Sequence, residues 1–272
     1  MKFLVAGATG RVGRYLVEQL NASGHQVLAL TRDASKAAFS RGVEIVEGDL
    51  TNPASIAPAM EGVTGLHLIN FNGGDYSPLE TGGEIIQLAE RAGVKRVTIL
   101  GAGEETSVEQ AAKASSLAWT ILQPVEFMTG ALDYAETIRS EGVVRQPFAN
   151  RKTAIVHEAD IAAVAAAVLT GDGHSGKSYV ITGPEVLTPN MMVDTIGATI
   201  GREIQFIELS EEEGREQWRV QGFPDDMIEF FVWAHGNTPE VGYTVVPTVE
   251  EVTGKPARTF AQWAQEYADA FK

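Results

Sequence analysis

Short apolar runs alternate with longer amphipathic stretches from the first residues of this sequence. Continuous runs such as FLVA and HLIN predict strands that are buried on both faces, because a strand with one solvated face alternates polar and apolar residues. The predicted strands are 2–6, 26–31, 43–47, 65–70, 96–100 and 118–122, and the amphipathic helices between them are 12–20, 53–60, 83–91 and 107–117. Strands separated by helix-length connections form βαβ units. We therefore expect an α/β fold, a doubly wound parallel sheet with helices on both faces.

The rhythm changes after Gln123. Helices are expected at 127–139 and 160–169, the second capped by Asp160, and a last strand at 178–182. From about Leu187 the chain is mostly helical and acidic, with EEEGREQW at 211–218. We predict a first domain over residues 1–186 and a small, mostly helical C-terminal lobe over residues 187–272.

Charge and cysteine content narrow the class of protein. The net charge of −15 and a pI near 4.8 argue against a nucleic-acid partner, whose binding surface is basic. The absence of cysteine removes disulfides, thiolate nucleophiles and zinc–thiolate sites, and we expect no metal. The start MKFLVAGATG lacks the regions of a signal peptide, and no apolar run reaches the roughly 20 residues of a membrane span. We expect no membrane association and a cytoplasmic location.

The segment GATGRVG carries the first chemical signal. Gly7, Gly10 and Gly13 lie between the first predicted strand and the first predicted helix. In a dinucleotide-binding turn these positions allow the tight turn, the approach of the backbone to a pyrophosphate and the close packing of helix on strand. Three glycines alone are a weak signal, but the strand before and the helix after are the context that supports the motif. The prediction is a Rossmann-type NAD(P)-binding domain.

The end of the second strand indicates which nicotinamide cofactor is bound. Arg32 stands where NAD-binding proteins usually carry an acid for the ribose 2′-hydroxyl, and Lys36 follows one turn later. Arginine suits a 2′-phosphate. We therefore expect NADPH, while Asp33 beside Arg32 leaves NADH open.

Other cofactor contacts are expected where further strands end, because ligands bind at the carboxyl edge of an open α/β sheet. Asp49 and Leu50 follow the third strand, although Thr51 or Asn52 with Pro53 there also reads as a helix start. The remaining residues at this edge are Asn70, Phe71, Asn72 and the run from Gly101 to Gly103.

These segments together resemble a known family. GATGRVG, LTRDASK, VEIVEGDLTNP and EQAAKASSLAWTILQPVEFM are similar to atypical short-chain dehydrogenases of the NmrA-like, NAD(P)H-binding quinone oxidoreductase group, over Met1 to about Pro189. The resemblance implies an extended Rossmann domain, a small C-terminal substrate lobe and NADPH. It implies that residues 124–158 contribute to the substrate site and that Pro124, Val125 and Phe127 cover the nicotinamide. The contacts that it assigns to the cofactor are those of Gly7, Thr9, Gly10, Arg11, Val12, Gly13, Arg32, Asp49, Leu50, Asn70 and Phe71.

The sequence also departs from this pattern. No tyrosine is followed four residues later by a lysine, the pair that acts as general acid in ordinary short-chain dehydrogenases and sugar-nucleotide epimerases. The lysine of isoflavone-type reductases is replaced by a Gly-Ala-Gly-Glu-Glu run, and Gln123 stands where the family has arginine. The catalytic residues therefore stay unknown, with His157, Tyr76 and Glu109 as candidates.

Each candidate has a structural alternative. A lone histidine such as His157 is more often a hydrogen-bonding structural residue, and Glu109 and Glu126 lie at predicted helix N-termini, where carboxylates are stabilising. Tyr134 could donate a proton but lies on a helical pattern that favours packing. We expect the substrate to contact Phe71, Gly103, Phe127, Met128, His157 and Trp233, although aromatic residues are more often simply part of the core.

One further motif is set aside. The segment GDGHSGKS at 171–178 fits the phosphate-loop pattern, with Lys177 and Ser178 in the key places. A phosphate loop follows a strand and opens a helix, whereas this segment follows a predicted helix and leads into a strand. We expect a surface connection.

The function that follows is an NADPH-dependent oxidoreductase that transfers hydride to a quinone or related aromatic or conjugated carbonyl compound, for example in the tailoring of aromatic polyketides. The alternative is a non-catalytic redox sensor that binds NADP(H). A nucleotide-sugar epimerase is disfavoured, because its base is absent. We expect a small aromatic or quinone substrate as partner, and a monomer or homodimer.

Overall fold

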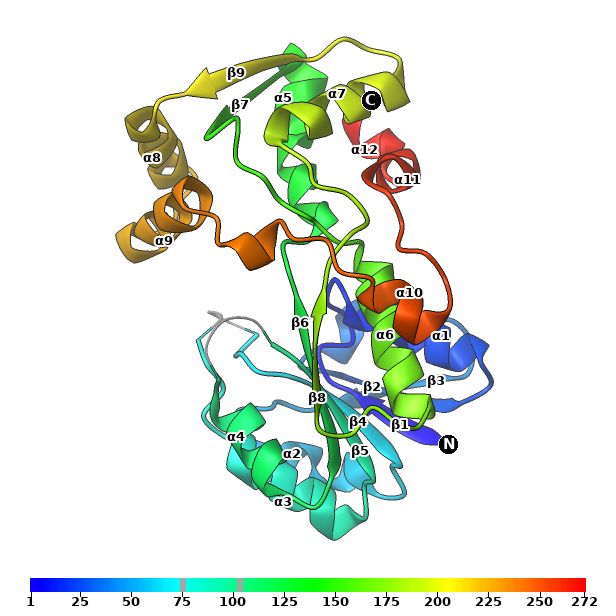
Figure 1. Cartoon of the computed structure of the whole chain (residues 1–272). Helices are drawn as coiled ribbons and strands as arrows, with labels where there is room; N and C mark the ends of the chain where they lie inside the picture. Colours follow the sequence, from blue (N-terminus) through cyan, green and yellow to red (C-terminus); the bar gives the residue numbers. More distant parts are fainter. Residues whose placement is uncertain (74–76, 102–104) are drawn as a thin grey trace. The chain divides into compact units, whose positions relative to one another are not determined.

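The fold was analysed in a computed structural model, which describes residues 1–73, 77–101 and 105–272. Contacts divide the chain into two compact units (Figure 1). Unit 1 consists of Met1–Pro124, Glu158–Ile181 and Thr248–Lys255, and unit 2 of Val125–His157, Thr182–Pro247 and Pro256–Lys272. The units interleave along the sequence. The division into two domains at residue 186, which the sequence predicts, stays a prediction.

Unit 1 is built on a seven-stranded parallel sheet with the strand order β3-β2-β1-β4-β5-β6-β8 (Figure 1). The strands are β1 (Lys2–Val5), β2 (Gln26–Thr31), β3 (Val43–Glu47), β4 (Gly65–Ile69), β5 (Arg96–Leu100), β6 (Ala118–Pro124) and β8 (Lys177–Ile181). The order reverses direction between β1 and β4, which is where open α/β sheets bind ligands. The prediction of a doubly wound Rossmann-type sheet is confirmed.

Helices cover both faces of this sheet (Figure 1). One face carries α1 (Gly13–Ala22), α6 (Glu158–Thr170) and α10 (Thr248–Thr253). The other carries α2 (Pro53–Ile56), η2 (Ala57–Met60), α3 (Gly82–Ala92) and α4 (Ser107–Ala114), while the short η1 (Ala34–Lys36) follows β2.

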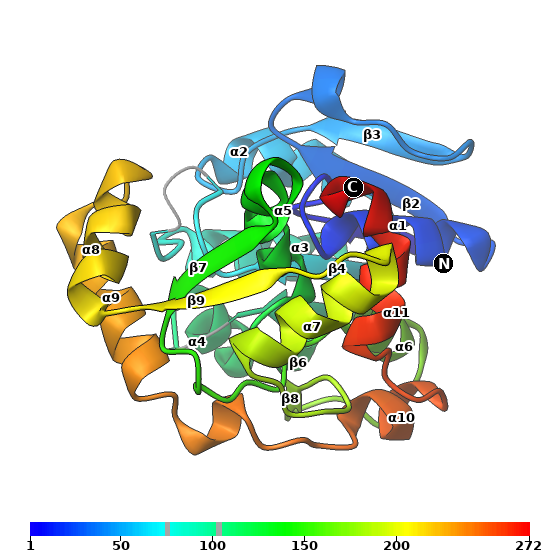
Figure 2. The same cartoon turned by 90° about the horizontal axis from the view of Figure 1, so that it is seen from above.

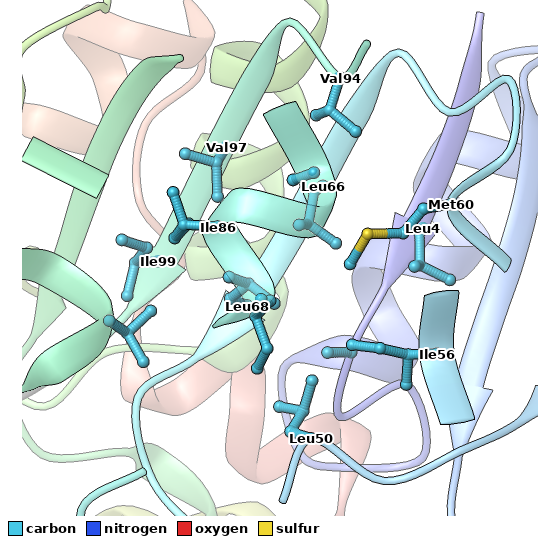
Figure 3. Close-up of a cluster of buried hydrophobic side chains, with 14 of the residues drawn as sticks. Leu4, Leu50, Ile56, Met60, Leu66, Leu68, Ile86, Val94, Val97 and Ile99 are labelled. Atoms are coloured by element: carbon cyan, nitrogen blue, oxygen red, sulfur yellow. The ribbon is translucent and has the colours of Figure 1, made fainter. Parts of the chain in front are cut away.

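The core explains why the central strands of the sheet are mostly apolar. Leu4, Leu66 and Leu68 pack with Ile56 and Met60 on the face of α2, η2 and α3 (Figure 3). Successive strand residues point to opposite faces, and Phe3 and Val5 are as fully buried as Leu4. Each fully buried leucine or isoleucine contributes about 1.5–3 kcal/mol, so both layers of helices are needed to stabilise the sheet.

Unit 2 combines helices with a small sheet. Its strands β7 (Val143–Pro147) and β9 (Gln205–Leu209) lie side by side and pair in parallel (Figure 2). Its helical segments are η3 (Met128–Tyr134), α5 (Ala135–Glu141), α7 (Pro189–Ile200), α8 (Glu211–Val220), α9 (Asp225–Gly236), η4 (Glu240–Gly242), α11 (Phe260–Glu266) and α12 (Ala268–Phe271). A second core joins these elements around the fully buried residues Trp263, Phe260 and Phe271.

The structure corrects several expectations from the sequence. The helix predicted at 127–139 is a 3-10 segment, η3, followed by α5, and Asp160 does not cap α6 because it is already the third residue of that helix. Neither β7 nor β9 was predicted, so the C-terminal half is less purely helical than expected. Both strands are short, and β9 is partnered by a strand some sixty positions earlier in the chain, which no local pattern reveals.

The connection at 171–178 follows α6 and leads into β8, in the order expected for a surface loop rather than for a phosphate loop. Within the described ranges, the helices are all too short or too polar to cross a lipid bilayer.

Candidate functional site

The loop after β1 is closed so tightly that side chains are excluded from it. Gly7 has a left-handed φ of +62°, and its carbonyl accepts a hydrogen bond from the Gly10 N–H at 2.9 Å. A Cβ added at Gly13 would lie 2.1 Å from the Gly7 carbonyl oxygen, and one added at Gly10 would lie 3.0 Å from it. Only glycine at position 13 allows the first turn of α1 to pack this closely on the loop.

This turn has the properties of an anion site. The first N–H groups of a helix have no partner within the helix, and the helix dipole adds partial positive charge at that end. The first turn of α1 carries no acidic residue, and Thr9, Gly10 and Arg11 are exposed beside it. Val12 and Gly13 are buried and form its packed side. The residues present therefore fit the diphosphate of a dinucleotide.

The guanidinium of Arg32, which follows the last residue of β2, is held in place by a hydrogen bond. Arg32 is exposed and donates a hydrogen bond through Nη2 to the Gly73 carbonyl at 2.6 Å, which leaves other guanidinium donors for a ligand. Asp33 is already engaged, because its carboxylate accepts from Ser35 N at 3.0 Å and pairs with Lys36 Nζ at 3.1 Å. The pKa of Asp33 is lowered, mainly by a hydrogen bond from the Ser35 hydroxyl and then by the contact with Lys36. The arrangement favours a phosphate over a ribose hydroxyl.

The loops after β3 and β4 continue this edge. Asp49 Oδ1 accepts from Thr51 N and Oγ1, both at 2.8 Å, and Asn52 precedes Pro53 at the start of α2 without a capping bond from its side chain. Leu50 is nearly buried. Beyond β4, Phe71 forms an isolated bridge with Pro78, and the Asn72 N–H donates to the Ser77 carbonyl at 2.7 Å.

Behind that edge lies a buried polar network. Asn70 Nδ2 donates to Glu109 Oε1 at 2.7 Å, and Glu109 Oε2 accepts from the Thr106 N–H at 3.0 Å in a capping box at the start of α4. A Cβ at Gly101 would come within 2.6 Å of both side chains of the Asn70–Glu109 pair. Glu109 is 4% exposed and both of its oxygens are in use. Its position supports a structural role.

The other two catalytic candidates fare differently. His157 is fully buried in unit 2, where its Nε2 lies 3.2 Å from Glu266 Oε2, a contact that ties α11 to the strand-like segment before α6. Tyr76 lies outside the described residues, as does Gly103. Of the three candidates, Glu109 therefore belongs to unit 1 and His157 to unit 2.

Unit 2 contains a cavity of about 690 Å³. It is lined by the segment that follows β6, including Phe127 and Met128, and by residues of β7, α7, α8 and α9. Its polar end is a two-pronged ion pair, in which Arg151 Nη1 and Nη2 reach the Glu126 carboxylate at 2.6 and 2.8 Å. Burial raises the pKa of Glu126, but the hydrogen bonds and charge of Arg151 outweigh this effect and hold that pKa below its usual range.

Part of the cavity lining is aromatic. Phe231 and His235 stack with their rings nearly parallel, 7° apart, and Trp218 meets His235 edge-on with ring centroids 5.9 Å apart. Burial lowers the pKa of His235 to about 4, with a further contribution from the charge of Arg151, so the imidazole is neutral at neutral pH. Tyr134 also lines the cavity, and burial raises its pKa to about 12.

The predicted substrate residues divide between these regions. Phe127 and Met128 line the cavity, and their contact with the substrate stays a prediction. Trp233 does not, because it is 57% exposed and packs on Phe230 at the outer face of α9. Phe231 and His235 are four residues apart and share the inner face of the same helix, whereas position 233 is turned away from it.

Sequence reasoning missed most of the cavity. The missed residues come from four separate segments and belong to no recognisable motif: Arg151, Met192, Trp218, and the pair Phe231 and His235 of α9. The i, i+4 spacing of Phe231 and His235 is the one signal that pointed to a common face.

The sheet and the glycine turn define an NAD(P)-binding Rossmann protein, and comparison with known proteins agrees. The profile of an NAD(P)H-binding family matches residues 7–109. A reductase of (4-alkanoyl-5-oxo-2,5-dihydrofuran-3-yl)methyl phosphate from Streptomyces griseus is 34% identical over 98% of both chains. An NAD(P)H azoreductase from Xenophilus azovorans is 33% identical over 98% of both.

Escherichia coli provides a third relative. Its quinone oxidoreductase 2 is 26% identical over 95% of this chain and 96% of its own. The crystal structure of an NADPH-dependent quinone oxidoreductase from the same organism, complexed with NADPH, has the same fold, with a TM-score of 0.81 at 24% identity over 98% of this chain and 99% of its own. The protein belongs to the NmrA-like, atypical short-chain dehydrogenase family of NAD(P)H-binding oxidoreductases. The non-catalytic alternative is not favoured.

Proposed function

We propose that this protein is an NADPH-dependent reductase that delivers hydride to a quinone or a related conjugated carbonyl compound. The observation that carries the proposal is the closed Gly7–Gly13 turn at the start of α1, with Arg32 fixed at the next strand end. The turn suits a diphosphate, and the guanidinium suits a 2′-phosphate.

The residues assigned to the cofactor have distinct tasks. The N–H groups at the Thr9–Gly13 end of α1 hold the diphosphate, Arg32 holds the 2′-phosphate, and Asp49 with Leu50 borders the adenine. Lys36 adds positive charge near the 2′-phosphate, although its pairing with Asp33 weakens that contribution. At the nicotinamide end we assign Asn70, Phe71, Asn72, Gly101, Pro124, Val125 and Phe127. The bound cofactor supplies the hydride, and the protein supplies binding and orientation.

The class of acceptor is supported by the names of the relatives. They denote the phosphate ester of an oxo-dihydrofuran, an azo compound and a quinone, and each of these contains a conjugated double bond that can accept hydride. Hydride addition to a quinone forms a phenolate-like anion that is far less basic than an alkoxide. Such a product needs no strong positioned acid. This requirement agrees with a chain in which no tyrosine is followed four residues later by a lysine.

The test is consumption of NADPH in the presence of a panel of quinones and polycyclic aromatic ketones, against a protein-free control. We expect turnover with quinones, and a much higher KM for NADH than for NADPH. A protein that binds NADPH but oxidises it with no member of the panel would contradict the proposal and return the redox sensor to consideration.

Two further expectations accompany this function. A cytoplasmic location and a monomeric or homodimeric state, without a nucleic-acid partner, stay predictions. Cell fractionation and light scattering of the purified protein test them.

A further inference from the structure

We infer that the cavity of unit 2 is the acceptor site, that it selects flat aromatic acceptors without negative charge, and that the Tyr134 hydroxyl donates a hydrogen bond to the acceptor oxygen that becomes anionic. This inference rests on the proposed function and names the substrate class and a catalytic residue for it.

The shape and lining of the cavity suit a flat ring system. Its volume of about 690 Å³ lies within the range of small-molecule sites. Trp218 and Phe231 supply aromatic surface to its lining, and the buried Met128 and Met192 supply adaptable apolar contacts. Glu126, at the polar end, follows the last residue of β6 by two positions in the chain.

The charges of the cavity exclude anionic acceptors. Arg151 is 9% exposed and its fork is taken by Glu126. Arg145, the other arginine of the lining, pairs with Glu141 at 2.7 Å. The remaining charged residues of the lining, Asp133 and Glu136, are acidic, and His235 is neutral. A carboxylate or sulfonate on the acceptor would therefore meet more carboxylates than arginines, and each of the two arginines already pairs with a carboxylate, so its binding has an energetic cost.

Tyr134 is suited to donate and not to ionise. It is 8% exposed, and among the described residues its hydroxyl makes no hydrogen bond, so the proton is available to a ligand. Burial raises its pKa to about 12, and the nearby Glu126 and Asp133 carboxylates add to the rise while Arg151 opposes it. A donor that stays protonated stabilises the developing oxyanion through a fixed hydrogen bond, without transferring its proton to a phenolate that is a weaker base than itself. Water can then protonate the product.

The first experiment tests the location of the site without turnover. Naphthoquinone binding is followed by quenching of tryptophan fluorescence in the wild type and in Gly130→Leu. Gly130 lines the cavity, and a Cβ there meets no atom within 4 Å, so the new side chain fills the cavity without a clash at its base. We expect at least roughly tenfold weaker quinone binding, with NADPH binding unchanged. The control is Gly83→Leu in α3 of unit 1, where a Cβ also meets nothing within 4 Å.

The second experiment tests the charge selection on the unaltered protein. kcat/KM for naphthoquinone is compared with that for its sulfonate, at low and at high salt. We expect the sulfonate to be at least roughly tenfold worse at low salt, with a smaller difference at high salt, because screening weakens like-charge repulsion. Equal values, or a preference for the sulfonate, would overturn the charge argument.

The third experiment tests Tyr134 through the basicity of the product. Tyr134→Phe should lower kcat about tenfold for quinones and closer to 100-fold for aromatic ketones, whose alkoxide products need the hydrogen bond more. The control is Tyr179→Phe, which loses a hydrogen bond of 2.8 Å to His174 in unit 1, outside the cavity. A merely structural role of Tyr134 would lower kcat equally for all acceptors.

The outcomes separate this inference from the proposed function. A wild type that reduces quinones, together with a Gly130→Leu variant that binds and reduces them normally, would overturn the cavity assignment and leave the reductase intact. A uniform loss across acceptors in Tyr134→Phe would overturn its role as donor. A wild type that binds NADPH but reduces no acceptor would contradict the proposed function itself.

Discussion

The glycine turn of unit 1 and the cavity of unit 2 are built in opposite ways. The turn uses backbone geometry within a few consecutive residues, with Gly7 at a φ of +62° and no room for a side chain at Gly13. The cavity uses side chains that arrive from segments as distant as Glu126 and His235. The cofactor, which is common to many enzymes, is assigned to the part that tolerates least change. The acceptor, which differs between relatives, is assigned to the part in which side chains are replaceable one at a time.

The largest effect that this contrast predicts is at Gly13. Gly13→Val places side-chain atoms where even a Cβ lies 2.1 Å from the Gly7 carbonyl oxygen. Overpacking of this kind costs roughly 1–3 kcal/mol or more, so we expect NADPH binding to weaken by about 100-fold. Fluorescence titration measures it. If the two regions are independent, quinone binding in the cavity stays at the wild-type level, and its loss would show that the turn also supports unit 2.

Arg32 offers a way to separate cofactor choice from cofactor binding. Arg32→Ser removes the guanidinium whose Nη2 is held by the Gly73 carbonyl. We expect KM for NADPH to rise about tenfold and KM for NADH to stay within about twofold, because a charge-assisted hydrogen bond to an exposed phosphate is worth about 1.5 kcal/mol. Steady-state kinetics with both cofactors give the ratio. An equal rise for both would mean that Arg32 contacts a part that they share.

The pH dependence of stability sharpens the description of the cavity wall. Burial holds the pKa of His235 near 4, below its ordinary value of 6.5, so the unfolded chain binds more protons between those pH values. Stability is therefore complete above pH 6.5 and declines as the pH falls towards 4. Because His235 is partly exposed, we expect a loss on the order of 1–2 kcal/mol.

Urea unfolding at pH 5 and at pH 7.5 measures how much of the free energy of unfolding is lost as His235 becomes protonated. His235→Phe removes the titrating group while keeping an aromatic ring against Phe231 and Trp218, so its stability should fall less between the two values than that of the wild type. The buried His67 of β4, whose pKa burial also lowers to about 4, contributes the same slope to both proteins. Identical slopes would show that His235 does not titrate in this range.

The smallest effect is expected at Lys36. Its ammonium is exposed and already paired with Asp33 at 3.1 Å, so Lys36→Gln should raise KM for NADPH by only about twofold. Comparison with Arg32→Ser at low and high salt is the measurement. If Lys36→Gln raised KM for NADPH as much as Arg32→Ser does, the 2′-phosphate would be assigned to η1 rather than to Arg32.

The elements that the sequence predicted correctly are those determined by residues close together in the chain. Strands 26–31, 43–47 and 96–100 were predicted with the bounds that the structure shows. The cause for 26–31 and 96–100 is a largely apolar run that is buried on both faces of the sheet, whereas 43–47 is a mostly exposed edge strand whose β-branched residues favour an extended backbone. The pair β7 and β9 was missed, since neither strand carries such a run and their pairing spans distant parts of the chain. The assignment of Glu109 as a catalytic candidate did not anticipate that Asn70 and Thr106 occupy its carboxylate.

The order of the residues alone determines that the protein has a βαβ sheet beginning with a side-chain-free turn, and that an arginine follows the second strand. Those features depend on neighbours in sequence: apolar period, turn geometry and the start of a helix. Only the folded chain decides that Glu126 meets Arg151, that Phe231 and His235 face the cavity while Trp233 faces solvent, and that the Tyr134 hydroxyl makes no hydrogen bond with the described residues. Burial and pairing are properties of the packed chain, and they set the charge, pKa and accessibility on which the proposed chemistry depends.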